Sequence, residues 1–196
     1  MQLNAKLFAA ALALPLLLAA CGSASTSSGS VVFNSLQTEY KDQTGNFVAC
    51  DNTTLQGGGT TKITSVSVKY SASGTVNSLD IGLRGSTTSD KDANYNVNVP
   101  GTSLTDLGGG NFKTVFTADS SVNLLPNSLQ PLKITVNPNP NVVIKNVTTS
   151  GDVGSFYTRL AINTPTGSAE TTSLIVAPRV KVYTSCTVTS TTAEQL

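Results

Sequence analysis

The chain has 196 residues, of which only 12% are charged; its formal net charge is +1, and it contains neither histidine nor tryptophan. A net charge so close to zero argues against binding to nucleic acid and against electrostatic binding to anionic lipid. Without histidine the chain cannot form a Ser-His-Asp or Cys-His catalytic site, a histidine-based zinc or copper site, or the usual general base of neutral pH. We therefore expect a protein that is not an enzyme and that needs no cofactor.

The first 20 residues have the parts of a secretory signal peptide. Lys6 supplies the positive charge, residues 7–20 form an apolar run, and Ala19 and Ala20 are the small residues that a cleavage site requires. The apolar run is shorter than the roughly 20 residues that a membrane-spanning helix needs. We expect residues 1–20 to be removed, which would leave 176 residues with eleven basic and eleven acidic side chains.

Residues 18–21, Leu-Ala-Ala-Cys, resemble the lipobox of bacterial lipoproteins. The resemblance covers residues 1–22 and implies that Cys21 becomes the first residue of the mature chain and carries fatty acyl chains such as palmitate. Two such chains hold a protein stably at a membrane, whereas one holds it weakly. Gly22, in place of an aspartate, favours the outer membrane where the host has two. The alternative is an ordinary signal peptide that happens to be followed by a cysteine.

Residues 21–30 are expected to be the lipidated cysteine and a flexible Ser/Gly-rich tether. We expect one folded domain at residues 31–190 and a loose polar tail at 191–196. The segment 137–141, Asn-Pro-Asn-Pro-Asn, cannot lie in a central strand because it contains two prolines. It is either a link between two small sandwiches or a loop within one.

Apolar and polar residues alternate with a period of two through most of the domain. This pattern is typical of antiparallel strands that have one face on a core and one in water. It predicts an all-β fold, an antiparallel β-sandwich that is immunoglobulin-like or related, with about nine to eleven strands. A Ser-Gly-Asp turn at 150–152 is expected to separate two of these strands. The clearest runs are residues 66–70, 79–83, 95–99, 132–136, 156–162 and 180–182.

Two cysteines remain in the expected mature chain, Cys50 and Cys186. An exported protein meets an oxidising compartment, so an even pair predicts a disulfide, with two free thiols as the alternative. The bond would join an early strand to the last one. It requires the two Cα atoms to lie about 4.4–6.8 Å apart.

Alternating oxygen-bearing side chains at residues 90–96 make a weak calcium candidate. Asp90, Asp92, Asn94 and the carbonyl of Asn96 resemble the start of an EF-hand loop. The resemblance stops at Tyr95, where the loop needs glycine, and at Gly101, where it needs glutamate. The other interpretation is a polar loop that leads into the strand beginning at Tyr95.

Carbohydrate binding is the other binding activity that we consider. We expect Tyr70 and Phe156 to lie in the core because they are on apolar faces of their strands. Tyr40, Tyr157 and Tyr183 are the aromatic side chains that remain as candidates to stack on a sugar. Hydrolysis by a pair of carboxylates is also open, although the sequence places no two of them on one face.

Our leading hypothesis is a non-enzymatic envelope lipoprotein, a structural or interaction subunit of a cell-surface or periplasmic assembly. Its expected partners are the membrane, through the lipid anchor at Cys21, and other envelope proteins. A ligand-binding module for carbohydrate or calcium is the alternative, and a hydrolase ranks third.

Overall fold

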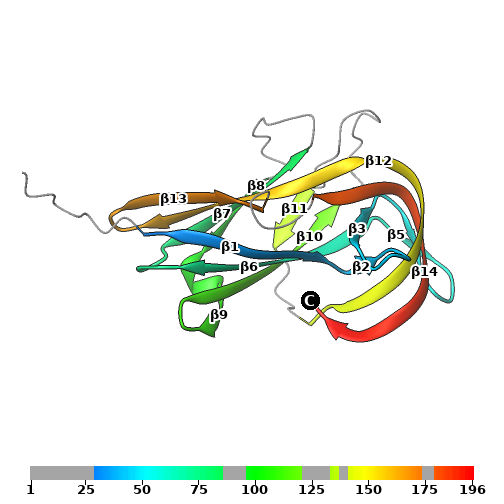
Figure 1. Ribbon diagram of the computed structural model, residues 1–196, viewed down its shortest axis with the longest axis horizontal. Helices are drawn as coiled ribbons and strands as arrows, with labels where there is room; N and C mark the ends of the chain where they lie inside the picture. Colours follow the sequence, from blue (N-terminus) through cyan, green and yellow to red (C-terminus); the bar gives the residue numbers. More distant parts are fainter. Residues whose placement is uncertain (1–28, 86–95, 121–132, 137–140, 174–178) are drawn as a thin grey trace, which may run out of the picture.

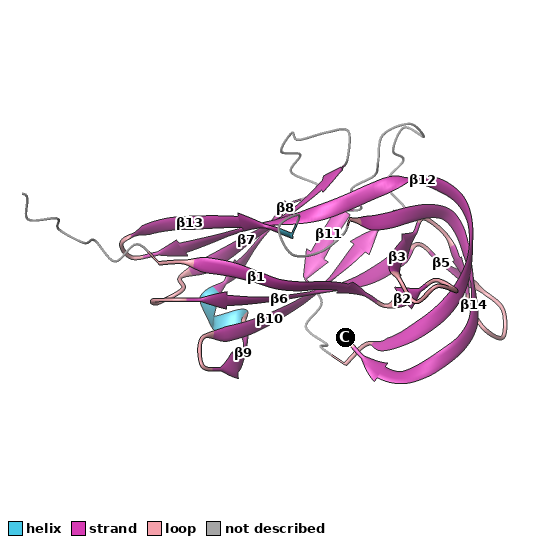
Figure 2. Cartoon of the chain, viewed as in Figure 1, coloured by secondary structure: helices cyan, strands magenta, loops and turns pink. Residues whose placement is uncertain are grey.

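The computed structural model describes residues 29–85, 96–120, 133–136, 141–173 and 179–196. Within these ranges the chain is almost entirely β-strand, as Figure 2 shows, which confirms the all-β prediction. A short 3-10 turn, η2 (Gly101–Ser103), connects two strands. No helix in this described part of the chain has the length and hydrophobicity to cross a membrane.

The strands form two sheets, and every pairing in the smaller sheet is antiparallel. Its order is β1-β6-β10-β11, with β9 paired to β10 beside the main path. The central strand β6 pairs with β1 on one side and with β10 on the other. The bounds are β1 (Val31–Thr38), β6 (Ile63–Ala72), β9 (Thr105–Gly108), β10 (Asn111–Asp119) and β11 (Lys133–Val136).

The larger sheet has the order β5-β4-β14-β3-β2-β12-β7-β8, and β13 also pairs with β12. Its bounds are β2 (Tyr40–Lys41), β3 (Phe47–Cys50), β4 (Thr53–Thr54), β5 (Thr60–Thr61), β7 (Ser78–Gly85), β8 (Asn96–Pro100), β12 (Val143–Thr164), β13 (Gly167–Thr172) and β14 (Val180–Gln195). Three of its pairings are parallel, namely β2 with β12, and β3 and β4 with β14.

The described residues contain fourteen strands, more than the nine to eleven that the sequence predicted. The difference comes from strands such as β2, β4 and β5, which have two residues each. A two-residue strand is too short to show a hydrophobic period, so only its pairing partners reveal it.

The main core lies between the two sheets, where the alternating residues of the longer strands meet. In β7, Leu79, Ile81 and Leu83 are almost completely buried, and Phe156 and Leu160 of β12 have no exposed surface. They pack with residues of β1, β6 and β10 from the facing sheet. The predicted inward faces of these strands are therefore confirmed.

Four strands of the larger sheet close into a ring. β14 pairs with β3, β3 with β2, β2 with β12, and β12 pairs again with β14. Figure 1 shows β12 and β14 curving together around the short strands. The ring encloses a second, smaller core of Tyr40, Val48, Cys50, Val147, Cys186 and Val188.

The turn predicted at residues 150–152 is wrong, because β12 runs through it without a break. Gly151 has a φ of 71°, and the register to β14 shifts between Asp152 and Gly154. The hydroxyl of Thr184 on β14 donates to the carbonyls of Ser150 at 3.1 Å and Gly151 at 3.2 Å. Gly151 and Asp152 therefore form a β-bulge that bends a long strand. A glycine inside a strand often marks such a bulge.

The loose tail predicted at residues 191–196 is also wrong. β14 continues to Gln195, and Leu196 is only 2% exposed. The Leu196 N–H donates to the carbonyl of Val142 at 2.9 Å, and Thr192 donates to the carbonyl of Ile144 at 2.9 Å. The polar residues 191–195 can form a strand beside β12 because threonine is β-branched and suits an exposed strand face.

Candidate functional site

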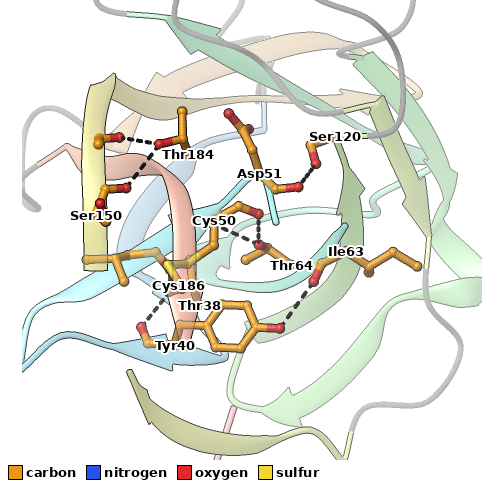
Figure 3. Close-up of a disulfide and its surroundings, with 12 residues drawn as sticks. Thr38, Tyr40, Cys50, Asp51, Ile63, Thr64, Ser120, Ser150, Thr184 and Cys186 are labelled. Carbon is orange, nitrogen blue, oxygen red and sulfur yellow. Dashed lines mark hydrogen bonds between the residues drawn. A yellow bond between two sulfur atoms is a disulfide. The ribbon is translucent and has the colours of Figure 1, made fainter. Parts of the chain in front are cut away.

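The predicted disulfide is confirmed. Cys50 in β3 is bonded to Cys186 in β14, and their Cα atoms lie 5.9 Å apart. Both side chains are buried in the ring core, at 0% and 2% exposure. In Figure 3, the hydroxyl of Thr64 accepts a hydrogen bond from the Cys50 N–H at 3.3 Å. The bond therefore joins β3 to β14 from inside the ring.

The calcium candidate lies mostly outside the described residues, since Asp90, Asp92 and Asn94 fall in the segment 86–95. Asn96 begins β8, and its side-chain oxygen accepts hydrogen bonds of 3.2 Å from both terminal nitrogens of Arg84. A guanidinium group beside Asn96 repels a cation, which weighs against calcium at this position. Cys21, the expected lipidation site, also lies outside the described residues.

The three candidate tyrosines have different environments. Tyr40 was expected to be available for a ligand, but it is completely buried in the ring core, and its hydroxyl donates to the carbonyl of Ile63 at 3.3 Å. That burial raises the pKa of Tyr40, and the charge of Glu39 adds to the effect. Tyr157 and Tyr183 are only partly buried. The expectation that Tyr70 and Phe156 lie in the core is confirmed.

A pocket of about 490 Å³ lies where the turn between β2 and β3 approaches the start of β14. Its volume is in the range of small-molecule sites. The apolar part of its lining comes from Leu36, Phe47, Val48 and Val180, and Tyr183 adds a second aromatic ring. Its polar residues are Asp42, Thr44, Asn46, Arg179 and Lys181.

The turn that forms one wall of the pocket is held by its own hydrogen bonds. Asp42 Oδ1 accepts from the Thr44 N–H at 2.9 Å, the Thr44 hydroxyl at 2.7 Å and the Asn46 N–H at 2.9 Å. Gly45 has a φ of 83°, a conformation that glycine adopts without strain. Partial burial raises the pKa of Asp42, but the hydrogen bonds from Thr44 and Asn46 outweigh it and lower that pKa overall. Asp42 is therefore a negative charge in a fixed position.

Two cations, Arg179 and Lys181, line the pocket at the start of β14. Lys181 is paired with Asp152 at 2.9 Å, and this hydrogen bond raises the pKa of Lys181. The Arg179 guanidinium lies 5.4 Å from the centre of the Tyr157 ring. Within the described residues Arg179 has no carboxylate partner, so its positive charge is available to a ligand.

The pocket contains few of the residues that the sequence suggested. Only Tyr183 was a candidate, while Arg179 and Lys181 occupy polar positions beside and within the predicted strand at 180–182. The Asp-Gln-Thr-Gly-Asn sequence at 42–46 was an available signal, because Asp and Gly at this spacing are typical of a tight turn. Nothing local in the sequence brings that turn to β14, which follows it by more than a hundred residues.

Comparison of the chain with protein-family models, with curated proteins and with solved structures gives no match in any of the three. Among the described residues, no three or more His, Cys, Asp or Glu side chains gather as they would to hold a metal ion. The volume and mixed lining of the pocket are compatible with a small-molecule ligand.

Proposed function

We propose that this chain is a non-enzymatic lipoprotein of the cell envelope, a structural or interaction subunit of a cell-surface or periplasmic assembly. The observation that carries the proposal is the Leu-Ala-Ala-Cys sequence at residues 18–21, directly after an apolar run. The disulfide between Cys50 and Cys186 supports it, because such bonds persist in oxidising compartments outside the cytoplasm.

The position of β1 indicates which end of the domain would face the membrane. Ser30 directly precedes β1, and its N–H donates to the Ser73 hydroxyl at 3.0 Å at one end of the sandwich. The β12–β13 turn lies at the same end, since a Cβ on Gly29 would come 2.5 Å from Thr164. Leu36, near the far end of β1, lines the pocket. A strand of eight residues spans about 26 Å.

A tether attached before Gly29 would therefore direct the β12–β13 turn toward the membrane. The ring and the pocket would lie at the opposite end, available to partners. A flexible tether of residues 22–28 would add roughly 13–16 Å of reach as a random coil. In this arrangement the anchor holds the protein, and the distal end makes the interactions.

The lipid anchor is tested by changing its cysteine. Cys21→Ser should move the protein from the membrane fraction to the soluble exported fraction, because the acyl chains are lost. The intact mass of the unchanged protein should correspond to a chain that begins at Cys21 and carries added acyl groups. The double variant Cys50→Ala/Cys186→Ala is the control and should stay in the membrane fraction. An unmodified chain with a free N-terminus would contradict the proposal.

A further inference from the structure

We propose that the pocket beside the β2–β3 turn binds a carbohydrate that carries a carboxylate, such as a uronic acid unit of an acidic polysaccharide. This goes beyond the envelope role, since a protein can be anchored without such a site. The inference rests on three features of the lining: an apolar floor with aromatic rings, a fixed hydrogen-bond acceptor, and a cation that has no carboxylate partner among the described residues.

The apolar floor suits the carbon face of a sugar ring. Leu36, Val48 and Val180, with exposures of 7%, 0% and 3%, are fixed in the two cores and form a rigid backing behind the floor, although they present little surface of their own. Phe47 and Tyr183 add aromatic surface that is only partly buried. Sugar rings present C–H groups on their faces, and aromatic side chains offer such groups a flat apolar surface.

The polar wall suits the hydroxyl groups of a sugar. Asp42 is ionised and held by the turn, so it can accept hydrogen bonds from a ligand without further ordering. The neighbouring side chains of Thr44 and Asn46 are exposed at the same wall. Because the wall is already ordered before a ligand binds, the entropic cost of binding is smaller.

The positive charge of Arg179 favours a ligand that is negatively charged. Its guanidinium group is exposed, lies over the Tyr157 ring, and has no ion pair among the described residues. Lys181, by contrast, is already neutralised by Asp152 at 2.9 Å. A planar guanidinium binds a carboxylate with two parallel hydrogen bonds. Since Asp42 and Arg179 both line the pocket, a ligand that uses both needs hydroxyl groups for Asp42 and a carboxylate for Arg179.

A cation is a poor occupant of the part of the pocket beside Arg179, because the guanidinium group would repel it. A neutral sugar would use the floor and Asp42 but would leave the guanidinium without a partner. A neutral sugar is therefore the comparison that tests the proposal.

The experiment is a calorimetric titration of the purified full-length chain with oligosaccharides of glucuronate, galacturonate and mannuronate, each beside its neutral counterpart. At least one acidic oligosaccharide should bind at least about ten-fold more tightly than its neutral counterpart, the difference expected for a charge-assisted hydrogen bond. Arg179→Gln should remove that preference without lowering the melting temperature, because the side chain is exposed.

Lys69→Gln is the matched control, since Lys69 lies in β6 of the other sheet and does not line the pocket. It removes one positive charge and should leave the acidic preference unchanged. The proposal is overturned if no acidic oligosaccharide binds, if neutral and acidic forms bind equally, or if the Arg179 and Lys69 variants behave alike. None of these results depends on Cys21, so failure of the anchor and failure of the pocket are distinguishable.

Discussion

The main sandwich and the closed ring bury very different amounts of apolar surface. In the described structure, eighteen buried residues form the main core, including Phe116, Phe156 and Leu160, whereas six form the ring core. Two of those six are Cys50 and Cys186, which are bonded to each other. The ring also depends on strands of two and four residues, β2 and β3. A region with so little hydrophobic surface needs a covalent link, as small secreted domains do.

Polar contacts fix the junction between the two regions. Glu39 lies where the chain passes from β1 in one sheet to β2 in the other, and it is only 5% exposed. Its carboxylate accepts from the Ser65 N–H at 2.6 Å and from the Lys145 ammonium at 2.6 Å. Its backbone N–H donates to the Ser65 carbonyl, and its carbonyl accepts from the Lys145 N–H. Glu39 therefore connects β6 of the sandwich with β12 of the ring.

The largest effect should follow from removing the disulfide. Cys50→Ala/Cys186→Ala should lower the free energy of unfolding by roughly 2–5 kcal/mol. Because the bond lies in the ring, hydrogen exchange should show β3 and the middle of β14 losing protection first, while β6 and β10 keep theirs. A thiol count on denatured, unreduced protein should find neither Cys50 nor Cys186 free.

Leu160→Ala is the comparison for the disulfide variant, since Leu160 is completely buried in the main core. It should cost about 2–5 kcal/mol by leaving a cavity, and it should lower protection throughout the sandwich. If the disulfide variant loosened β6 and β10 as much as β3, the two regions would be one cooperative unit, and the contrast between them would be wrong.

A smaller effect should follow from removing the negative charge of Glu39 at the junction. Glu39→Gln keeps the shape of the side chain but removes the charge that pairs with Lys145, whose side chain is 27% exposed. We expect a loss of about 1–3 kcal/mol in the free energy of unfolding, measured by urea denaturation. Asp152→Asn breaks the exposed pair with Lys181 and should cost less than about 1 kcal/mol. Equal losses for the two variants would show that Glu39 has no special role at the junction.

The smallest effect concerns Asp51, which follows Cys50 directly. Burial raises the pKa of Asp51, although the positive charge of Lys62 partly opposes it. Asp51 Oδ1 is buried and has no hydrogen-bond partner in the described structure. Since the folded pKa lies above the unfolded value, the ionised carboxylate destabilises the fold at neutral pH. That penalty is relieved as the pH falls through the folded pKa toward the unfolded pKa.

Asp51→Asn should therefore raise the melting temperature at pH 7 by up to about 2–4 °C, the change that ~1 kcal/mol produces in a chain of this size. The advantage should disappear below about pH 4, where the unfolded carboxyl is also protonated. Asp106→Asn, on the exposed strand β9, controls for the loss of one negative charge. A stabilisation that persisted unchanged in acid would contradict the assignment of the effect to the buried charge.

The sequence by itself determined the fold class, the inward faces of the main strands and the disulfide. A period of two is a local property, so residues such as Leu79, Ile81 and Leu83 indicate their buried face without knowledge of any partner strand. The disulfide could be predicted because two cysteines remained after the expected leader, which left a single possible pairing.

Only the tertiary structure decided which strands pair, and through them the ring and the pocket. Gly151 is compatible with a turn and with a bulge, and the presence of β14 beside β12 selects the bulge. The residues after Thr189 form a strand because β12 supplies the hydrogen-bond partners. Tyr40 is buried because the ring closes around it, and the pocket forms because β14 lies against a turn more than a hundred residues earlier in the chain. Pairing between strands so far apart in the chain depends on the whole fold. The backbone donors and acceptors that form it are the same in nearly every residue, so the local sequence does not identify the partner strand.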